Sequence, residues 1–271
     1  MNSARPAVFA GLVCTLLVVG AGAAGPTAAT ASAVTTPGGV EIALGTFAVE
    51  VGATLAFEIV RDAPCPCLCD PVSVTELSLV NDEGAILYSE SFDPAVDTSE
   101  WIGRVALVDA AGGTPLSPGR HTAHIDTTVG RFTAHIEGIE AFQLPDAGPF
   151  AASATACGLE LRVYRLVTEA DDGASIALRQ GDRLMVLLAG NATTGFQWEN
   201  ALFYEFAVLR ETDEPEYRAK PYPQDMIGFG GTFVFRYQAV APGPQAFRFI
   251  YHQPWMSVQP EQVVEFDVTV Y

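Results

Sequence analysis

The sequence predicts an all-β protein: two Ig-like β-sandwich domains in tandem after a signal peptide. Two observations support this fold. After Thr36, short stretches of alternating polar and apolar residues recur, separated by turn signals at intervals of roughly 8–12 residues. The length of 271 residues suits two domains of ordinary size, and a 49% hydrophobic content is ample for two cores.

The N-terminus has the features of an export signal over residues 1–33. Arg5 precedes a nearly continuous apolar run at residues 7–19, and small residues follow with possible cleavage points after Ala23 or Ala33. The run is short for a membrane helix, which needs about 20 apolar residues. We therefore expect a secreted or periplasmic protein with no membrane span after signal cleavage.

An accessory domain is predicted over residues 34–143. Residues 47–51, 54–60 and 121–125 alternate as half-buried strands do, and a Pro/Gly turn at residues 115–120 leads into the last of them. A segment rich in Pro, Gly, Ala and Ser then predicts a linker at residues 144–157.

A second domain is predicted over residues 158–271, where the alternation is clearest. Three strands are expected, the first two joined by a turn at residues 241–245. Their core-facing side chains are Phe233, Phe235, Tyr237, Phe247, Phe249, Tyr251, Val264, Phe266, Val268 and Val270.

The formal net charge is −18. Such a chain repels phosphate backbones and anionic lipid, so nucleic acid is not an expected partner. Solubility alone is a sufficient reason for the charge.

Four cysteines follow the signal: Cys65, Cys67, Cys69 and Cys157. In an exported chain they favour disulfides, and we expect Cys157 to pair with one of the three clustered thiols. A metal site built on the cluster is an alternative, although the spacing lacks the paired cysteines of most zinc sites. No residue pattern around them suggests an activating partner for a catalytic thiol.

Three short motifs in the second domain indicate a function. They are N-A-T-T-G-F-Q-W at residues 191–198, G-F-G-G at 228–231 and Q-P-W at 253–255, and G-D-R-L-M-V-L-L leads in at 181–188. In order and spacing they resemble the chagasin family of cysteine peptidase inhibitors, marked by N-P-T-T-G-[FY]-x-W, G-x-G-G and R-P-W. Two antiparallel strands between successive motifs would bring all three to one end of the sandwich.

The resemblance implies a reversible inhibitor of papain-like cysteine peptidases, with no catalytic residue, cofactor or metal of its own. Thr193 and Thr194 would lie nearest the target's thiolate, Trp255 against one wall of the cleft, and the second motif on the opposite flank. The implied target-binding residues are Asn191, Ala192, Thr193, Thr194, Gly195, Phe196, Gly228, Phe229, Gly230, Gly231, Gln253, Pro254 and Trp255.

Local chemistry fits a pre-ordered loop. Asn191 can hydrogen-bond its own loop backbone, and Gly195 can take a positive φ without steric cost. We expect Trp198 to pack into the core and Trp255 to be exposed. Two positions depart from the family pattern: Ala192 stands in place of Pro, and Gln253 in place of Arg.

Two other functions remain open at this point. The chain could be a non-inhibitory Ig-like surface or adhesion module whose loops bind something else. It could also be an enzyme or metal protein centred on the cysteine cluster. Inhibition kinetics against papain separates the first from an inhibitor, and metal analysis tests the second.

Overall fold

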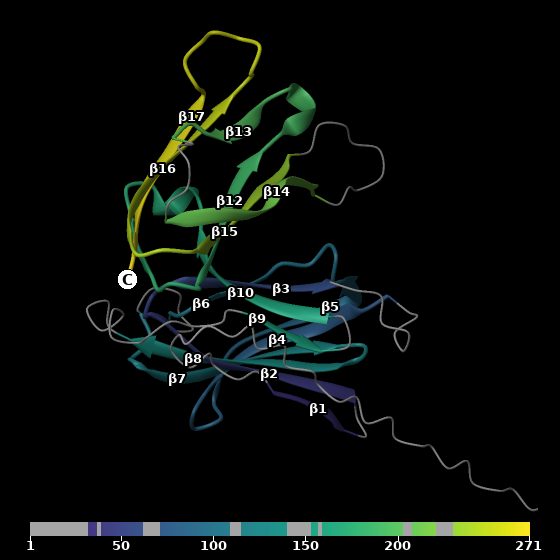
Figure 1. The fold of residues 1–271 in the computed structure, drawn as a ribbon. Coiled ribbons are helices and arrows are strands. Elements are labelled where there is room, and N and C mark those ends of the chain that lie inside the picture. The colour runs from purple at the N-terminus through teal and green to yellow at the C-terminus, as the bar shows by residue number, and fades with distance from the viewer. Residues whose placement is uncertain are drawn as a thin grey trace, which may run out of the picture.

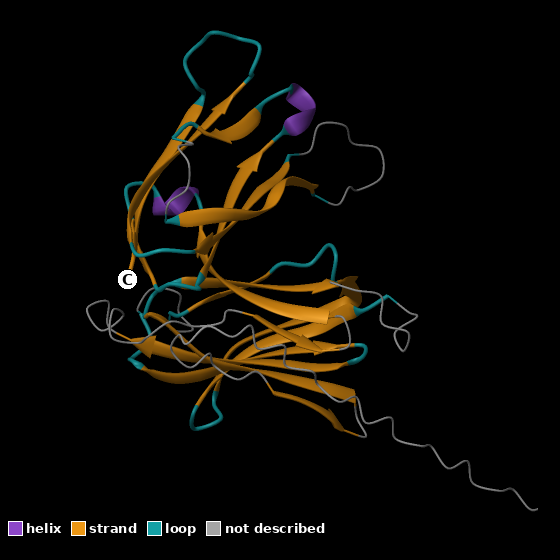
Figure 2. Ribbon diagram, viewed as in Figure 1, coloured by secondary structure: helices purple, strands orange, loops and turns teal. Residues whose placement is uncertain are grey.

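The computed structural model describes residues 32–36, 39–61, 71–108, 115–139, 153–156, 159–202, 208–220 and 230–271, with the backbone alone for 32–46 and 153–156. These residues form β-strands and two single-turn 3-10 helices, η2 (Glu169–Asp171) and η3 (Ala192–Thr194) (Figure 1, Figure 2). The predicted all-β class is confirmed. Among the described helices, none has the length and apolar character that a bilayer crossing requires.

The first half of the chain forms a sandwich around one hydrophobic core. One sheet has the order β1 (Ser32–Thr36), β2 (Gly39–Glu50), β8 (Gly130–Ile139), β7 (Gly119–Thr127), β4 (Ser73–Asn81), β5 (Ile86–Asp97). The facing strands are β6 (Gly103–Ala106), β3 (Thr54–Arg61) and β10 (Leu159–Val167), with β9 (Ser153–Ala156) paired to β10. Buried apolar side chains of both layers fill the space between them.

The second half forms another sandwich. Strands β12 (Arg183–Gly190), β15 (Gly231–Ala239) and β14 (Leu209–Ala219) face a sheet of order β11 (Ser175–Leu178), β17 (Gln262–Val270), β16 (Gly243–His252), β13 (Gln197–Asn200). All ten side chains predicted to face this core are buried in it. The alternation therefore predicted the inward faces of β15, β16 and β17 correctly.

Strand β10 belongs to both halves. It pairs antiparallel with β3 along Leu159–Arg165 and parallel with β12 at its end. Leu159, Leu161 and Val163 pack in the first core, and Val167 in the second. The domain boundary at residue 158 stays a prediction, but these contacts favour a boundary at the C-terminal end of β10.

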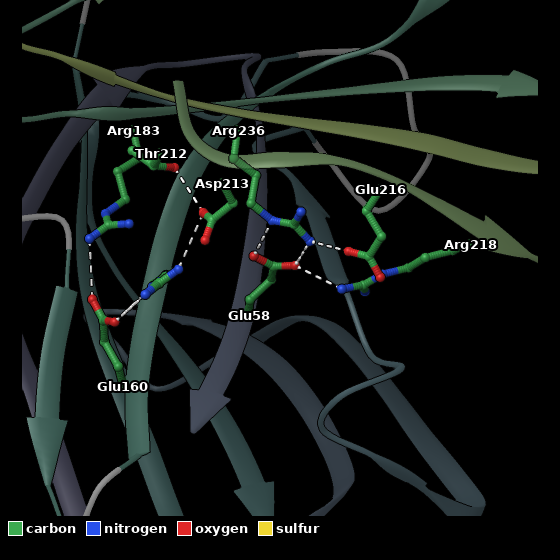
Figure 3. A network of polar contacts seen from close by, with 9 residues as sticks. Glu58, Glu160, Arg183, Thr212, Asp213, Glu216, Arg218 and Arg236 are labelled. Carbon is green, nitrogen blue, oxygen red and sulfur yellow. Dashed lines mark hydrogen bonds and ion pairs between the residues drawn. The ribbon is translucent and has the colours of Figure 1, made fainter. Parts of the chain in front are cut away.

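Through β10, the strands β14, β15, β12, β10, β3 and β6 form one sheet that runs through both sandwiches. Where the sandwiches meet, the outward side of β3 and β10 packs against the outward side of β12 and β15. A small apolar cluster joins Ala56 of β3 to Met185 of β12 and Val234 of β15. Beside it, the Glu58 carboxylate accepts two hydrogen bonds from the Arg236 guanidinium, at 3.0 and 2.7 Å (Figure 3). The two halves are thus held by both backbone pairing and buried side chains.

Several sequence predictions lie outside the described residues. The four cysteines are among them, together with most of the signal segment and of the linker. The disulfide between Cys157 and the cluster stays a prediction.

Candidate functional site

The three motifs meet at one end of the second sandwich. Gly190 at the end of β12 pairs with Gly231 at the start of β15, so the first and second motifs adjoin. Gln197 at the start of β13 pairs with His252 at the end of β16, which brings in the third motif. Strand β13, which starts at the end of the first motif, and strand β14 lead from the first motif to the second, as the topology argument requires. The first and third loops extend away from the first sandwich, at the top of Figure 1.

The first loop, residues 191–196, is a 3-10 turn closed by its own polar groups. The Asn191 Oδ1 atom accepts from the Thr193 backbone N–H at 3.2 Å and from the Thr193 hydroxyl at 2.6 Å. The Thr194 hydroxyl donates to the Asn191 carbonyl at 2.6 Å. Gly195 ends the turn with φ 80°, which favours glycine. The predicted roles of Asn191 and Gly195 in ordering the loop are confirmed.

The third loop, residues 253–261, braces the first. The Gln253 side-chain amide donates to the Thr194 carbonyl at 3.0 Å. The Trp255 ring lies against Gly195 so closely that a Cβ there would overlap it. Trp255 nevertheless keeps 68% of its surface exposed. Gln253, one of the two residues that depart from the family pattern, therefore holds two loops together.

An aromatic base supports the first loop. The Tyr251 ring stacks on Phe196 and tilts against Trp198, with both centroid distances at 5.1 Å. The Tyr251 hydroxyl accepts from the Asn191 N–H at 2.7 Å, and the Trp198 indole N–H donates to the Ala189 carbonyl at 2.8 Å. Trp198 is only 4% exposed. The contrast predicted between the buried Trp198 and the exposed Trp255 is confirmed.

Two other residues of the implied binding set face inward. Ala192 and Phe196 are partly buried and pack against the core. Their side chains anchor the turn, whereas Thr193 and Thr194 are exposed on its outer side. Pro254 is exposed beside Trp255.

The described part of the second motif depends on close backbone approach. A Cβ on Gly230 would lie 2.9 Å from the Gly190 carbonyl oxygen, and one on Gly231 would overlap the Arg218 carbonyl oxygen. Side chains larger than hydrogen do not fit at either position without displacing a strand. Gly228 and Phe229 lie outside the described residues.

The structure adds residues that the motif comparison did not single out. Met256 and Val258 are 46% and 60% exposed, so that, together with Trp255, the third loop exposes three large apolar side chains. Below them, His252 pairs with Glu199 at 3.0 Å. The sequence offered one signal for Met256 and Val258: they are apolar residues in a loop that lacks the alternation of a strand, which indicates exposed apolar side chains.

We call the surface formed by residues 191–196, 230–231 and 253–261 the loop end. Its described residues form an ordered surface without a group of side chains arranged for catalysis. Both threonine hydroxyls donate within the loop, so neither proton is free for a partner. Over the described ranges, no group of three His, Cys, Asp or Glu side chains could hold a metal ion. The geometry favours recognition by shape and apolar contact.

Comparison with known proteins points to the same region. The family model of the chagasin family peptidase inhibitors I42 matches residues 177–270. Chagasin of Trypanosoma cruzi is 31% identical over 93 residues, which cover 33% of this chain and 81% of chagasin. Amoebiasin-2 of Entamoeba histolytica is 23% identical over 107 residues, covering 39% of this chain and 84% of that protein. The crystal structure of the cysteine protease inhibitor EhICP2 from the same organism shares 21% identity with a TM-score of 0.36, and the match covers 39% of this chain and 94% of EhICP2.

Proposed function

Because this chain belongs to the chagasin family of peptidase inhibitors, we propose that its three loops reversibly inhibit papain-like cysteine peptidases by occupying the active-site cleft. Thr193 and Thr194 would face the target's thiolate. Trp255 would lie along one wall of the cleft, and the glycine-rich second loop would cover the other flank.

One observation carries the proposal: the first loop is a compact turn and not the extended backbone that a peptidase binds as substrate. Extended peptides bind through strand-like backbone hydrogen bonds. Residues 192–194 form a 3-10 turn instead, and Gly195 has a left-handed conformation. The Thr194 carbonyl already accepts a hydrogen bond from Gln253. The target's thiolate would thus be covered without meeting an extended scissile bond.

Pre-ordering supplies the affinity in this mechanism. The hydrogen bonds of Asn191, the brace from Gln253 and the ring of Tyr251 fix the loop before binding. Less conformational entropy is then lost when a target closes around it. The exposed Trp255 ring adds a large apolar contact of the kind that dominates many interfaces.

The test is steady-state inhibition of papain by the full chain. We expect tight inhibition that is reversed by dilution, with the inhibitor chain intact by mass spectrometry after long incubation. Absence of inhibition would favour the alternative of a non-inhibitory Ig-like binding module. Cleavage between residues 192 and 196 would show that the loop is read as substrate.

Secretion belongs to the same proposal, since residues 1–33 have the composition of an export signal. Expression of the full chain in a secreting host should place it outside the cytoplasm. N-terminal sequencing of the exported protein should begin at residue 24 or 34. Retention of the uncut chain in the cytoplasm would contradict this part.

A further inference from the structure

A recess lies on the side of the C-terminal sandwich, away from the tips of the loops. It opens where the edge strands β13 and β14 face each other without pairing, and its volume is about 510 Å³. We call it the side cleft. Five aromatic rings and three carboxylates line it: Trp198, Tyr217, Phe233, Phe235, Tyr237, Glu199, Glu211 and Glu216.

One carboxylate of the side cleft, Glu211, has no partner among the residues that the structure describes. Glu199 pairs with His252, and Glu216 pairs with Arg218 and Arg236. Glu211 has no ion pair or hydrogen bond with any residue that the structure describes. Burial, together with the neighbouring negative charge of Glu214, raises the pKa of Glu211 above its ordinary value. A cation placed beside Glu211 would relieve that unfavourable environment.

Two polar atoms in the wall also lack well-formed partners. Asn200 is 8% exposed, and its Nδ2 atom lies near the Tyr237 hydroxyl without a hydrogen bond of good geometry. The Tyr217 hydroxyl oxygen is buried and has no partner within the described part of the chain. Buried polar groups of this kind are normally satisfied, by protein, water or ligand. Both can donate to a carbonyl oxygen.

The larger cleft between the two sandwiches differs in the pairing of its buried carboxylate, Glu58. It has a volume of about 770 Å³ and contains more charged side chains. There Glu58 binds Arg236 and Arg218, and Arg162 binds Asp213, so cation and anion compensate each other (Figure 3). Its buried carboxylate is therefore already paired with arginine, unlike Glu211.

We propose that the side cleft binds a lysine or arginine side chain carried on a peptide segment of a partner protein. The ammonium or guanidinium group would approach Glu211, and the aromatic rings would line its path, an arrangement that attracts cations. The backbone carbonyl of the same peptide would accept from Asn200 or Tyr217. The net charge of −18 favours encounter with basic segments.

The side cleft begins just behind the first loop. Gln197 and Trp198, which follow that loop directly, form part of its wall. A partner engaged at the loops could thus place a basic residue in the cleft, a step that rests on the proposed inhibition. Binding of a free peptide does not depend on it.

The experiment titrates the full chain with acetyl-Ala-Arg-Ala-amide and, as a neutral control, acetyl-Ala-Gln-Ala-amide. Calorimetry gives the Kd of each peptide. Glu211→Gln removes the unpaired charge with little change in shape. Asp267→Asn is the matched control, because it removes one negative charge from an exposed side chain outside the side cleft.

We expect the basic peptide to bind the parent and Asp267→Asn equally, and Glu211→Gln roughly 3- to 10-fold more weakly. The neutral peptide should bind at least as weakly as the basic peptide binds Glu211→Gln. Equal binding of both peptides, an unchanged Kd in Glu211→Gln, or no binding at millimolar peptide would overturn the proposal. Papain inhibition by the same variants is a separate readout, so failure of the inhibitory function would be seen independently.

Discussion

The two sheets of the C-terminal sandwich carry the same inward pattern but have different surroundings on their outer faces. On β15, the outward side chains Val234 and Arg236 are 0% and 6% exposed, because the first sandwich covers them. On β16 and β17, the outward Arg248 and Glu265 form an ion pair whose side chains are 47% and 58% exposed. One outer face therefore stabilises the molecule, while the other contributes little and tolerates change.

The largest expected effect is on the free energy of unfolding, when an ion pair on the covered outer face is broken and compared with one on the exposed outer face. Arg236→Ala leaves the buried Glu58 with a single cation, Arg218, at 3.3 Å. Removing one partner of a buried ion pair typically costs about 3–5 kcal/mol, because the remaining charge stays buried. Arg248→Ala breaks an exposed pair and should cost no more than about 1 kcal/mol. Thermal and urea unfolding of both variants measures the two costs.

The same pair of variants separates stability from recognition. Both positions are remote from the loop end, so the folded fraction of each variant should inhibit papain as the parent does. Equal destabilisation by the two changes would mean that the first sandwich does not bury the outer face of β15 in solution.

A smaller effect, on binding alone, is expected at the loop end. Trp255→Ala removes the exposed ring that covers Gly195. Inhibition of papain should weaken by roughly 2 kcal/mol, about 30-fold in Kd, as for aromatic anchors in other interfaces. Because the ring is mostly in solvent, the free energy of unfolding should change by less than about 0.5 kcal/mol. An unchanged inhibition constant in a folded variant would refute the three-loop mechanism.

The sequence predicted features that depend on neighbouring residues and missed those that depend on contacts between residues far apart in the chain. Alternation along one strand predicted which faces of β15, β16 and β17 point to the core, and residue type predicted the turn at Gly195. The contact of Glu58 with Arg236 joins residues 178 apart, and nothing local to either residue announces it. The sequence did not predict that β10 is shared by the two sandwiches for the same reason, since its apolar residues fit either core equally well.

The loop end shows the same limit at shorter range. The motifs predicted which loops converge, because strand counting fixes the end at which each loop emerges. They did not predict that Gln253 would hydrogen-bond the Thr194 carbonyl, because that contact depends on how two loops pack. The substitution of Gln for the family's Arg suggested a lost cation. The structure shows a side-chain amide with a definite partner.

The smallest expected effect tests that brace. Gln253→Ala deletes one partly exposed hydrogen bond and should weaken inhibition by about 1 kcal/mol, through a less ordered first loop. Gln253→Glu keeps the shape but replaces the donor by a carboxylate facing the Thr194 carbonyl, so it should weaken inhibition more than Ala. Gln253→Arg retains donors in reach of that carbonyl and should inhibit as well as the parent or better. The order Arg, Gln, Ala, Glu in falling affinity, with thermal midpoints unchanged, is the signature of a bracing hydrogen bond. If Gln253→Glu inhibits as well as the parent, the hydrogen bond contributes nothing to the order of the first loop, and Trp255 remains the contact on which inhibition depends.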